Sequence, residues 1–295
     1  MPIIELKNVS KLYGFGDATN VALDEVSLSI EPGEFVAVMG PSGCGKSTLM
    51  NIIGLLDRPT HGEYSLHERA VARLRTNQRA KVRRDTVGFV FQSFNLLPRL
   101  TVLENVALPL AYKGKSAARR IKMASSMLER VGLHDREFYF PWQLSGGQIQ
   151  SAAIARALIN DPKIIIADEP TGNLDSASSR LVMELLSEVH KTGNTILFVT
   201  HNPELTRYAT RVVYMHDGAI VHDEQTALGE IAATARKVMF ALPTMTEEDD
   251  LAGISLLMKT VPGSDKPAGK SSAKTIKSAK SAAKKTKTKK RGGKK

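Results

Sequence analysis

The most restrictive feature of this sequence is a glycine-rich octet, GPSGCGKS, at residues 40–47. The five residues before it, FVAVM, are typical of a strand buried on both faces, and the STLMNII that overlaps its end predicts a helix beginning near Lys46. A strand, the spacing G-x-x-x-x-G-K-S and a helix, in this order, are the elements of a phosphate-binding loop. Backbone N–H groups of such a loop converge on phosphate oxygens, and the helix dipole favours the same anion. We therefore expect a nucleotide-binding α/β fold built around this loop.

Individual roles can be assigned to three residues of the octet. Lys46 is expected to reach the terminal phosphates of a nucleotide, and the Ser47 hydroxyl is in the position that ligates Mg²⁺. Cys44 occupies a variable position, where a small buried side chain explains it as well as a redox role does.

Composition narrows the class of protein. With 42% hydrophobic residues, 295 residues can bury the core of one large domain or two small ones. The single cysteine excludes an intramolecular disulfide framework and a cysteine-rich zinc site. No apolar run reaches the roughly 18 residues that span a bilayer, and the N-terminus lacks a secretory leader pattern. We expect a cytoplasmic protein that depends on a partner for any membrane part.

The net charge of +11 is concentrated at the C-terminus. Residues 259–295 contain 14 of the 41 Lys and Arg residues and one of the 30 acidic residues. This tail therefore carries +13, and residues 1–258 carry −2. Its Lys, Ala, Ser and Thr composition cannot bury a core and predicts disorder.

The N-terminal part predicts antiparallel strands. Residues 3–8 and 21–30 alternate apolar and polar side chains, as half-exposed strands do. Tyr13 is expected in a loop between them, either as a partly buried aromatic or as a ring that stacks on a nucleotide base.

The middle of the sequence predicts a helical insertion. Residues 68–84 are rich in Arg and Ala and indicate a helix or helical loop, followed by an apolar strand at 87–91 that ends at Gln92. Helical sequence then runs from Thr101, a predicted N-cap with a capping box, to about residue 133. A further helix is expected at 149–160.

Two further buried strands end in polar residues. IIIA at 164–167 is followed by Asp168 and Glu169, and TILFVT at 195–200 is followed by His201. Ligands of open parallel sheets bind where the strands end, so we expect these side chains beside the phosphate loop. There the first carboxylate can hold Mg²⁺ and the second can face the attacking water.

An ordered set of motifs then identifies a family. GPSGCGKST, Gln92, LSGGQ at 144–148, IIIADE at 164–169, NLD at 173–175 and His201 occur in the order of the ATP-binding subunit of ABC transporters, which residues 2–224 resemble. The stretches at 11–34, 87–110 and 165–179 are similar to the subfamily that drives macrolide exporters (MacB), lipoprotein-release complexes (LolD) and the cell-division complex (FtsE).

This resemblance implies a fold and partners. The fold is an α/β P-loop NTPase with a RecA-like core, an antiparallel β lobe and a helical lobe, at about residues 93–160, that carries the ABC signature. Two copies close head to tail around two ATP molecules, and a separate membrane permease of export or lipoprotein-release type is the other partner. The chain would act as an ATPase at the inner face of the cell membrane.

The resemblance also assigns roles to individual residues. Tyr13 would stack on adenine, and Asp175 would couple the two sites of the dimer. Glu169 would be the general base or orient the water, and His201 would contact the γ-phosphate. Ser47 and Gln92 would contact Mg²⁺, with Asp168 behind them. The phosphates would be held by Gly40, Pro41, Ser42, Gly43, Cys44, Gly45, Lys46, Ser47 and Thr48, and by Ser145, Gly146 and Gly147 of the second copy.

Other positions leave alternatives open. Phe94, Leu96 and Leu97 would either line the groove for a permease helix or serve as core residues of the lobe junction. The family usually has Arg where this chain has Ser151, so we expect the helix that follows the signature to lack some of its usual local stabilisation. The Asp-Gly or Asn-Gly sequence that usually forms a hairpin turn in the family is also missing near residues 66–71.

The C-terminal part leaves function classes open. Residues 225–258 predict short helices, and the tail at 259–295 is a solvated extension, an anchor for anionic lipid or a binder of nucleic-acid phosphates. The main hypothesis is the transporter ATPase. The alternatives are a soluble ABC ATPase that acts on nucleic acid or ribosomes, and a regulatory module that holds ATP but barely hydrolyses it.

Overall fold

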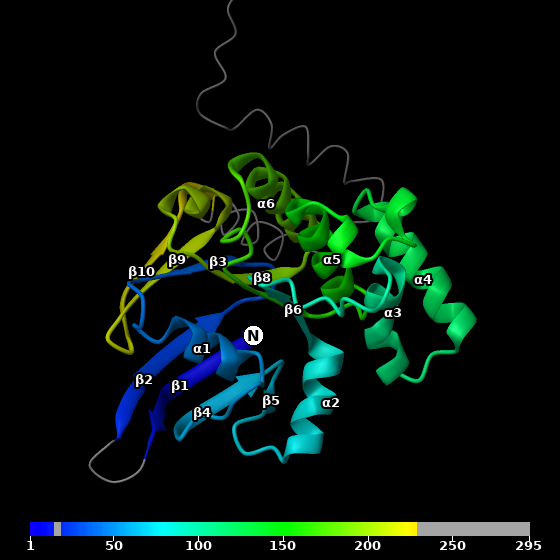
Figure 1. Ribbon diagram of the computed structural model, residues 1–295. Coiled ribbons are helices and arrows are strands. Elements are labelled where there is room, and N and C mark those ends of the chain that lie inside the picture. The colour runs from blue at the N-terminus through cyan, green and yellow to red at the C-terminus, as the bar shows by residue number, and fades with distance from the viewer. Residues whose placement is uncertain (15–18, 229–295) are drawn as a thin grey trace, which may run out of the picture. The chain divides into compact units, whose positions relative to one another are not determined.

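Two β-sheets with helices around them form the part of the computed structural model that is described, residues 1–14 and 19–228 (Figure 1). These residues belong to one compact unit, Met1–Ala241. The helices expected at 225–258 and the tail at 259–295 lie outside the described residues, apart from 225–228.

The larger sheet has six strands in the order β10-β9-β3-β8-β7-β6. Strands β9, β3, β8, β7 and β6 are parallel, and β10 pairs antiparallel with β9. Their bounds are β3 Phe35–Met39, β6 Val87–Phe91, β7 Ile164–Asp168, β8 Thr195–Val199, β9 Arg211–His216 and β10 Ala219–Gln225.

Both faces of this sheet are buried, as the apolar run of β3 predicts. Val36 and Val38 belong to a core shared with helix α1 (Lys46–Ile53) and the second sheet, whereas Phe35 and Ala37 belong to a core on the opposite face. That opposite face is covered by α5 (Gly146–Leu158) and α6 (Ser176–Lys191). Burial on alternate faces follows from the two-residue period of a strand.

The second sheet is antiparallel, with strand order β2-β1-β4-β5. Its strands are β1 Ile4–Tyr13, β2 Asn20–Ile30, β4 His61–Leu66 and β5 Arg69–Ala70. Apolar residues of β1, β2 and β4 pack with those of α1, so α1 lies between the two sheets (Figure 1).

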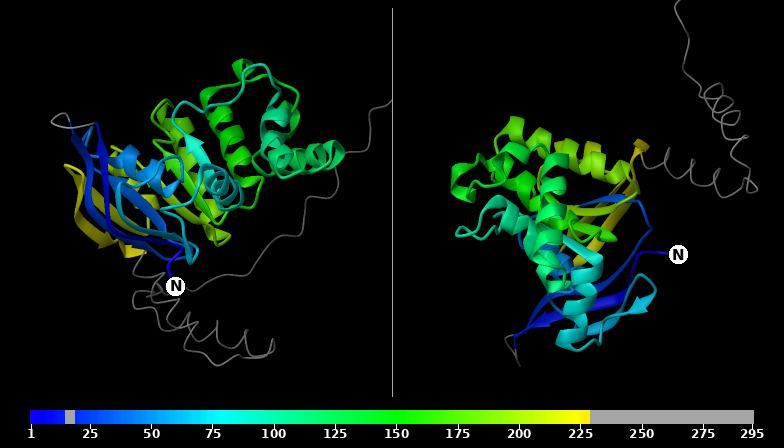
Figure 2. Two further views of the ribbon diagram at one scale, coloured as in Figure 1. Left: turned by 90° about the horizontal axis from the view of Figure 1, so that it is seen from below. Right: turned by 90° about the vertical axis from the view of Figure 1, so that its right-hand side faces the viewer.

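A helical region stands beside the large sheet (Figure 2). It has its own apolar core, to which α3, α4 and α5 contribute. Thr101 caps α3 as predicted, because its hydroxyl accepts from the Glu104 N–H at 3.2 Å while Glu104 Oε2 accepts from the Thr101 N–H at 2.8 Å. The remaining elements are α2 Thr76–Thr86, α3 Val102–Tyr112, α4 Ala117–Arg130, η2 His134–Arg136, η3 Pro141–Gln143 and η4 Pro203–Tyr208. These arrangements confirm the predicted fold class.

Three local predictions need correction. The expected helix at 68–84 is instead strand β5, a loop and then α2, because β5 pairs with β4 through a turn in which His67 and Glu68 adopt positive φ without glycine. Tyr13 is the last residue of β1 and not part of a loop. Helix α5 begins at Gly146, three residues before the expected start, because Ser145 and Gln148 form a capping box.

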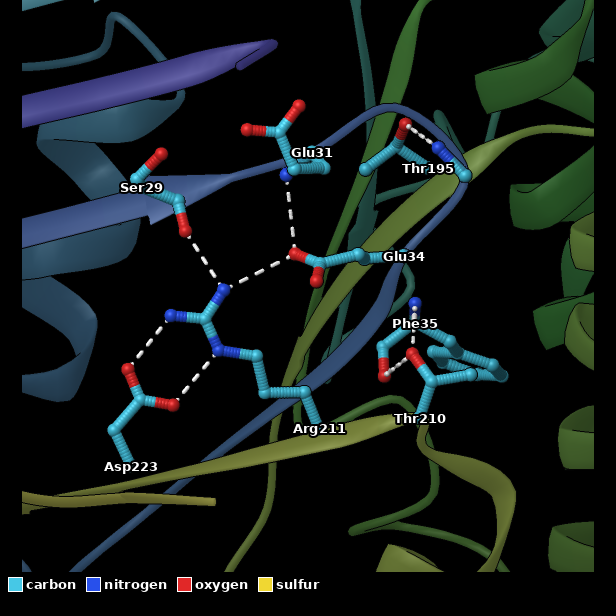
Figure 3. Close-up of polar contacts among 9 residues, drawn as sticks. Ser29, Glu31, Glu34, Phe35, Thr195, Thr210, Arg211 and Asp223 are labelled. Carbon is cyan, nitrogen blue, oxygen red and sulfur yellow. Dashed lines mark hydrogen bonds and ion pairs between the residues drawn. The ribbon is translucent and has the colours of Figure 1, made fainter. Parts of the chain in front are cut away.

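A network of charged side chains lies where the parallel strands of the large sheet begin, here called the amino edge (Figure 3). Arg211 donates to both oxygens of Asp223 at 2.6 and 2.7 Å, to Glu34 at 3.1 Å and to the Ser29 carbonyl at 2.7 Å. Since Ser29 belongs to β2 and Arg211 to β9, this side chain joins the two sheets.

Candidate functional site

The carboxyl ends of four neighbouring strands meet at one edge of the large sheet. Phe91 pairs with Asp168, Asp168 with Val199, and Val199 with Val38. The residues that directly follow these strands therefore lie along the same edge, as the sequence predicted.

The phosphate loop is compact on one side and open on the other. Gly40 has φ +151° and its backbone lies so close to the Met215 carbonyl that an added Cβ would be 2.2 Å from the oxygen. Gly43 has φ +82°, and nothing lies within 4 Å of the place where its Cβ would be. Gly45 precedes α1 and supplies no side-chain cap. The first N–H groups of α1 are thus left for a ligand, and the geometry suits an anion.

Lys46 supplies a buried positive charge to this loop. Its residue is 8% exposed, and its ammonium donates to the carbonyls of Gly40 at 2.8 Å and Pro41 at 2.6 Å. Within the described part of the chain no carboxylate forms an ion pair with Lys46. A buried ammonium that contacts only dipoles is costly, and an anionic ligand would compensate it. Cys44 belongs to the apolar core that α1 shares with the second sheet, and this burial supports its packing interpretation; its sulfur lies 3.7 Å from the ammonium.

A hollow of about 520 Å³ opens beside the loop and gathers half of the predicted site residues. It reaches from the end of β1 to the tips of β7 and β8. The predicted residues that line it are Tyr13, Ser42, Gly43, Gly45, Lys46, Ser47, Thr48, Glu169 and His201. The hollow can therefore offer an aromatic ring, phosphate donors and a carboxylate to one ligand.

Glu169 lies at the end of the hollow with two polar neighbours. Its Oε1 is 3.1 Å from His201 Nδ1. Its Oε2 and the Gln92 Nε2 border the same point, since a Cβ added to Gly172 would lie 3.2 and 2.7 Å from them. Glu169 has φ +44°, a conformation that costs a non-glycine residue energy and is common at functional sites.

Asp168 lies next to Glu169 at the tip of β7. Burial, and then the charge of Glu169, raise the pKa of its carboxyl above the ordinary value, while Lys46 acts in the opposite sense. A divalent cation would stabilise the ionised form that burial disfavours.

The donor set suits magnesium and not a cage of protein ligands. Among residues 1–14 and 19–228, no cluster of three or more His, Cys, Asp or Glu side chains could hold a metal. Mg²⁺ is typically bound by one or two carboxylates and completes its shell with other oxygens, phosphates and water. Asp168, Ser47 and Gln92 fit that pattern.

The signature residues lie outside this hollow. Gly146 and Gly147, at the start of α5, pack against Leu174 and Ser178, where an added Cβ would approach to 3.0 Å. Asp175 caps α6 by accepting from the Ser178 N–H at 2.9 Å, and this bond holds the pKa of its carboxyl below the ordinary value. Ser145, Gly146, Gly147 and Asp175 are absent from the lining of the hollow in the described structure. One chain therefore does not bring the signature to its own phosphate loop.

Two residues that the sequence analysis missed support the strand tips. Gln150 is fully buried on α5 and donates to the Pro170 carbonyl, one residue after Glu169, at 2.7 Å. Arg156 donates to the carbonyls of Phe94 and Asn95, just after Gln92. No motif or periodicity marks these residues, because their partners are distant in sequence. Ser151, whose effect on α5 was in question, donates to the Gly147 carbonyl at 3.0 Å.

A second cavity of about 770 Å³, here named the lateral pocket, lies between α2, β6, α3 and α5. Its lining includes Phe89, Phe91, Leu108, Pro109 and the 70% exposed Tyr112. Of the segment after Gln92, Asn95 lines it, whereas Leu96 packs in the helical core and Leu97 is exposed.

Comparisons with known proteins agree with this geometry. Residues 23–172 match the family model described as ABC transporter. The chain is 53% identical over 219 residues to an uncharacterised ABC transporter ATP-binding protein of Methanocaldococcus jannaschii, covering 74% of this chain and 98% of that one. It is 49% identical to the macrolide export ATP-binding/permease protein MacB of Hyphomonas neptunium, covering 75% of this chain but 34% of that longer protein.

A solved structure has the same arrangement. A dimeric ATP-binding cassette in a post-hydrolysis state, bound to ADP and phosphate, is 46% identical and has a TM-score of 0.70 over 75% of this chain and 98% of its own. Within the described residues, no helix is long and apolar enough to span a membrane. The chain therefore belongs to the ATP-binding proteins of the ABC transporter family, and its activity is that of an ATPase.

Proposed function

We propose that this ATPase powers a separate membrane permease, of the kind that exports a substrate or releases lipoproteins. The observation that carries the proposal is the hollow that gathers an aromatic ring, a phosphate loop and a carboxylate, with the lateral pocket open elsewhere on the same cassette.

ATP would lie in the hollow with its base at Tyr13 and its phosphates at residues 40–48. The Lys46 ammonium would exchange its carbonyl partners for the terminal phosphates. The open side of Gly43 would let a phosphate approach the backbone N–H groups of the loop closely. Ser47, Gln92 and Asp168 would hold Mg²⁺, which supplies neutralisation of the phosphate charge when bound.

Glu169 would polarise the attacking water. Its Oε1 would stay oriented by His201, and its Oε2, which borders Gln92, would accept the hydrogen bond from the water. His201 would also contact the γ-phosphate. Since phosphoryl transfer needs positioning and charge neutralisation more than covalent chemistry, these fixed groups suffice.

A second copy of this chain would complete the site. The signature residues Ser145, Gly146 and Gly147 lie outside the hollow of their own chain, and the related solved cassettes are dimeric. In a head-to-tail dimer the N-terminus of α5 would meet the nucleotide held by the partner, which suits its dipole. Asp175, at the start of α6 beside those glycines, would couple the two sites.

The lateral pocket would receive a cytoplasmic segment of the permease. Its lining combines the aromatic residues of β6 with Arg156, which also holds the segment after Gln92. Occupation of the pocket would therefore act on the Mg²⁺ side of the site. The Methanocaldococcus jannaschii relative, matched over 98% of its length, supports a permease on a separate chain. The cassette would then sit peripherally on the inner face of the cell membrane.

The Lys-rich tail would strengthen that attachment. Residues 259–295 carry +13, and each lysine near an anionic leaflet contributes about 1 kcal/mol. The phosphates of nucleic acid would attract the same charge, so the test below also detects binding of nucleic acid by the tail.

The test is affinity capture from gently solubilised native membranes, with ATP present and Glu169→Gln in the bait. We expect capture of a membrane permease, and Tyr112→Asp in the lateral pocket should abolish it without lowering ATP binding. The matched control is Ile121→Asp, which changes an exposed apolar side chain of α4 outside the pocket. Capture of nucleic acid or ribosomes without a permease would overturn the transporter role. Truncation after Thr260 tests the tail separately.

A further inference from the structure

Tyr13 is held by two neighbouring side chains that the ATPase mechanism does not use. Its hydroxyl donates to Asp57 Oδ2 at 2.9 Å. The Lys11 ammonium lies 2.9 Å from the same carboxylate oxygen and 4.8 Å from the centroid of the Tyr13 ring. We call Lys11, Tyr13 and Asp57 the tyrosine clamp.

The clamp is anchored to the helix that starts at the phosphate loop. The Asp57 N–H donates to the carbonyl of Asn51, in α1, at 3.0 Å. Lys11 also donates to the Arg58 carbonyl at 2.9 Å, and its side chain is only 13% exposed. The position of the tyrosine ring is thereby tied to α1 and not only to the end of its own strand.

The protonation states of Tyr13 and Asp57 suit these hydrogen bonds. Burial, followed by the bond to Asp57, raises the pKa of the Tyr13 phenol, which therefore remains a donor. Burial would raise the pKa of Asp57, but hydrogen bonds from Lys11, the Arg58 N–H and Tyr13 outweigh it, so the net shift is downward. Asp57 remains an ionised acceptor for both partners.

We infer that Lys11 and Asp57 are positioning residues that fix the Tyr13 ring for the nucleotide base. The ammonium covers one face of the ring, and the ring lines the hollow that also contains the phosphate loop. A base that stacks on a ring already held in place does not have to immobilise it, which improves affinity. This inference rests on the proposed stacking role of Tyr13.

The test is a double-mutant cycle on the full chain, with ATPase rates at varied ATP concentration. Lys11→Met and Asp57→Ala should each raise KM for ATP by about 3- to 10-fold, with kcat changed less than about 2-fold. Tyr13→Ala should raise KM at least as much. In the Tyr13→Ala background, Lys11→Met should have no further effect, because the clamp acts only through the ring.

Two controls separate positioning from general structural support. Lys7→Met removes an exposed lysine of the same strand that pairs with Glu5, and KM should not change. Inhibition by tripolyphosphate, which has no base to stack, should be equally strong for wild type and Lys11→Met. Lys11→Arg, which keeps the positive charge, should restore most of the affinity.

Three results would overturn the inference. The first is a rise in KM for Lys11→Met that persists in the Tyr13→Ala background. The second is an unchanged KM for Lys11→Met and Asp57→Ala when Tyr13→Ala is impaired, which leaves the proposed function intact. The third is an unchanged KM for Tyr13→Ala itself, which would remove the stacking role as well.

Discussion

At the amino edge of the large sheet, Arg211 donates to two carboxylates and one carbonyl, and its pKa is raised chiefly by the bond to Asp223 (Figure 3). At the carboxyl edge, Lys46 donates to two backbone carbonyls and the Cys44 sulfur, and Asp168 has a raised pKa because burial and Glu169 disfavour its charge. The same sheet thus carries ion-paired charges at one edge, whereas Lys46 and Asp168 at the other edge have no ion-pair partner among the described residues.

The comparison distinguishes charged groups that stabilise the fold from charged groups that belong to the ligand site. Charges at the amino edge have their partners within the chain, so they join β2, β9 and β10 whether or not a ligand is present. At the carboxyl edge, Lys46 and Asp168 form no ion pair within the described residues, so a bound nucleotide and cation would supply the opposite charges. An active site of this kind is expected to cost the unliganded fold some free energy.

The largest effect is expected at the carboxyl edge. Glu169→Gln should lower the ATP hydrolysis rate by about 10²-fold or more, since the amide cannot polarise the attacking water. The midpoint of thermal unfolding should stay unchanged, and the ATP-bound dimer should accumulate in size-exclusion chromatography. Glu188→Gln, at an exposed position of α6, is the control for both measurements. Residual activity above about a tenth would contradict the assigned role.

At the amino edge the effects on stability and activity should be reversed. Arg211→Met should lower the free energy of unfolding by about 2–3 kcal/mol, because Glu34 keeps a 10% exposed carboxylate without its partner. Urea unfolding measures this loss, and kcat at saturating ATP should change less than about 2-fold. Arg119→Met, which removes an exposed arginine of α4, should alter neither quantity. A large drop in kcat would show that the two edges are coupled.

A smaller loss of stability is expected from Thr210, also at the amino edge. Its hydroxyl oxygen accepts from the buried Phe35 N–H at 2.9 Å. Thr210→Val would leave that donor without a partner and should cost about 1–2 kcal/mol in urea unfolding. Thr210→Ser keeps the oxygen and should recover most of the loss. Equal losses for both variants would assign the effect to packing.

The smallest effect is a gain in stability at the carboxyl edge. Asp168 has a folded pKa above its unfolded value, so its ionised form destabilises the folded state at neutral pH. Asp168→Asn should therefore unfold at higher urea concentration than wild type at pH 7 with a chelator present, although its ATPase activity is lost.

The same explanation predicts how the stability difference between wild type and Asp168→Asn changes with pH. The wild type should recover stability as pH falls through the raised folded pKa toward the unfolded value of about 3.9, so the advantage of Asp168→Asn should shrink. An advantage that grows as the pH falls would contradict this explanation.

The sequence predicted the carboxyl edge better than the amino edge. The phosphate loop, Gln92, the carboxylates at 168–169 and His201 directly follow apolar runs whose burial places them along one edge. Local patterns therefore sufficed to predict which of them meet. Arg211 gave no such signal, because Glu34 is 177 positions away and the pairing depends on how two sheets pack.

Local prediction failed where pairing with another segment, and not the composition of the segment itself, decided the structure. Of the helix or helical loop expected at 68–84, residues 76–84 are helical in α2, whereas Arg69 and Ala70 form β5 and pair with β4. Gln150 and the tyrosine clamp were missed because each joins segments that are not neighbours in sequence.

The sequence by itself determined the nucleotide chemistry, since a phosphate loop and strand-end residues act through short-range geometry that the backbone carries with it. The tertiary structure alone decided which side chains hold those groups in place, namely Lys11 and Asp57 at Tyr13, Gln150 behind Glu169, and Arg211 between the sheets. The physical reason is that such contacts form only after the hydrophobic layers pack, and the layer spacing and strand register then set which polar groups come within hydrogen-bond distance.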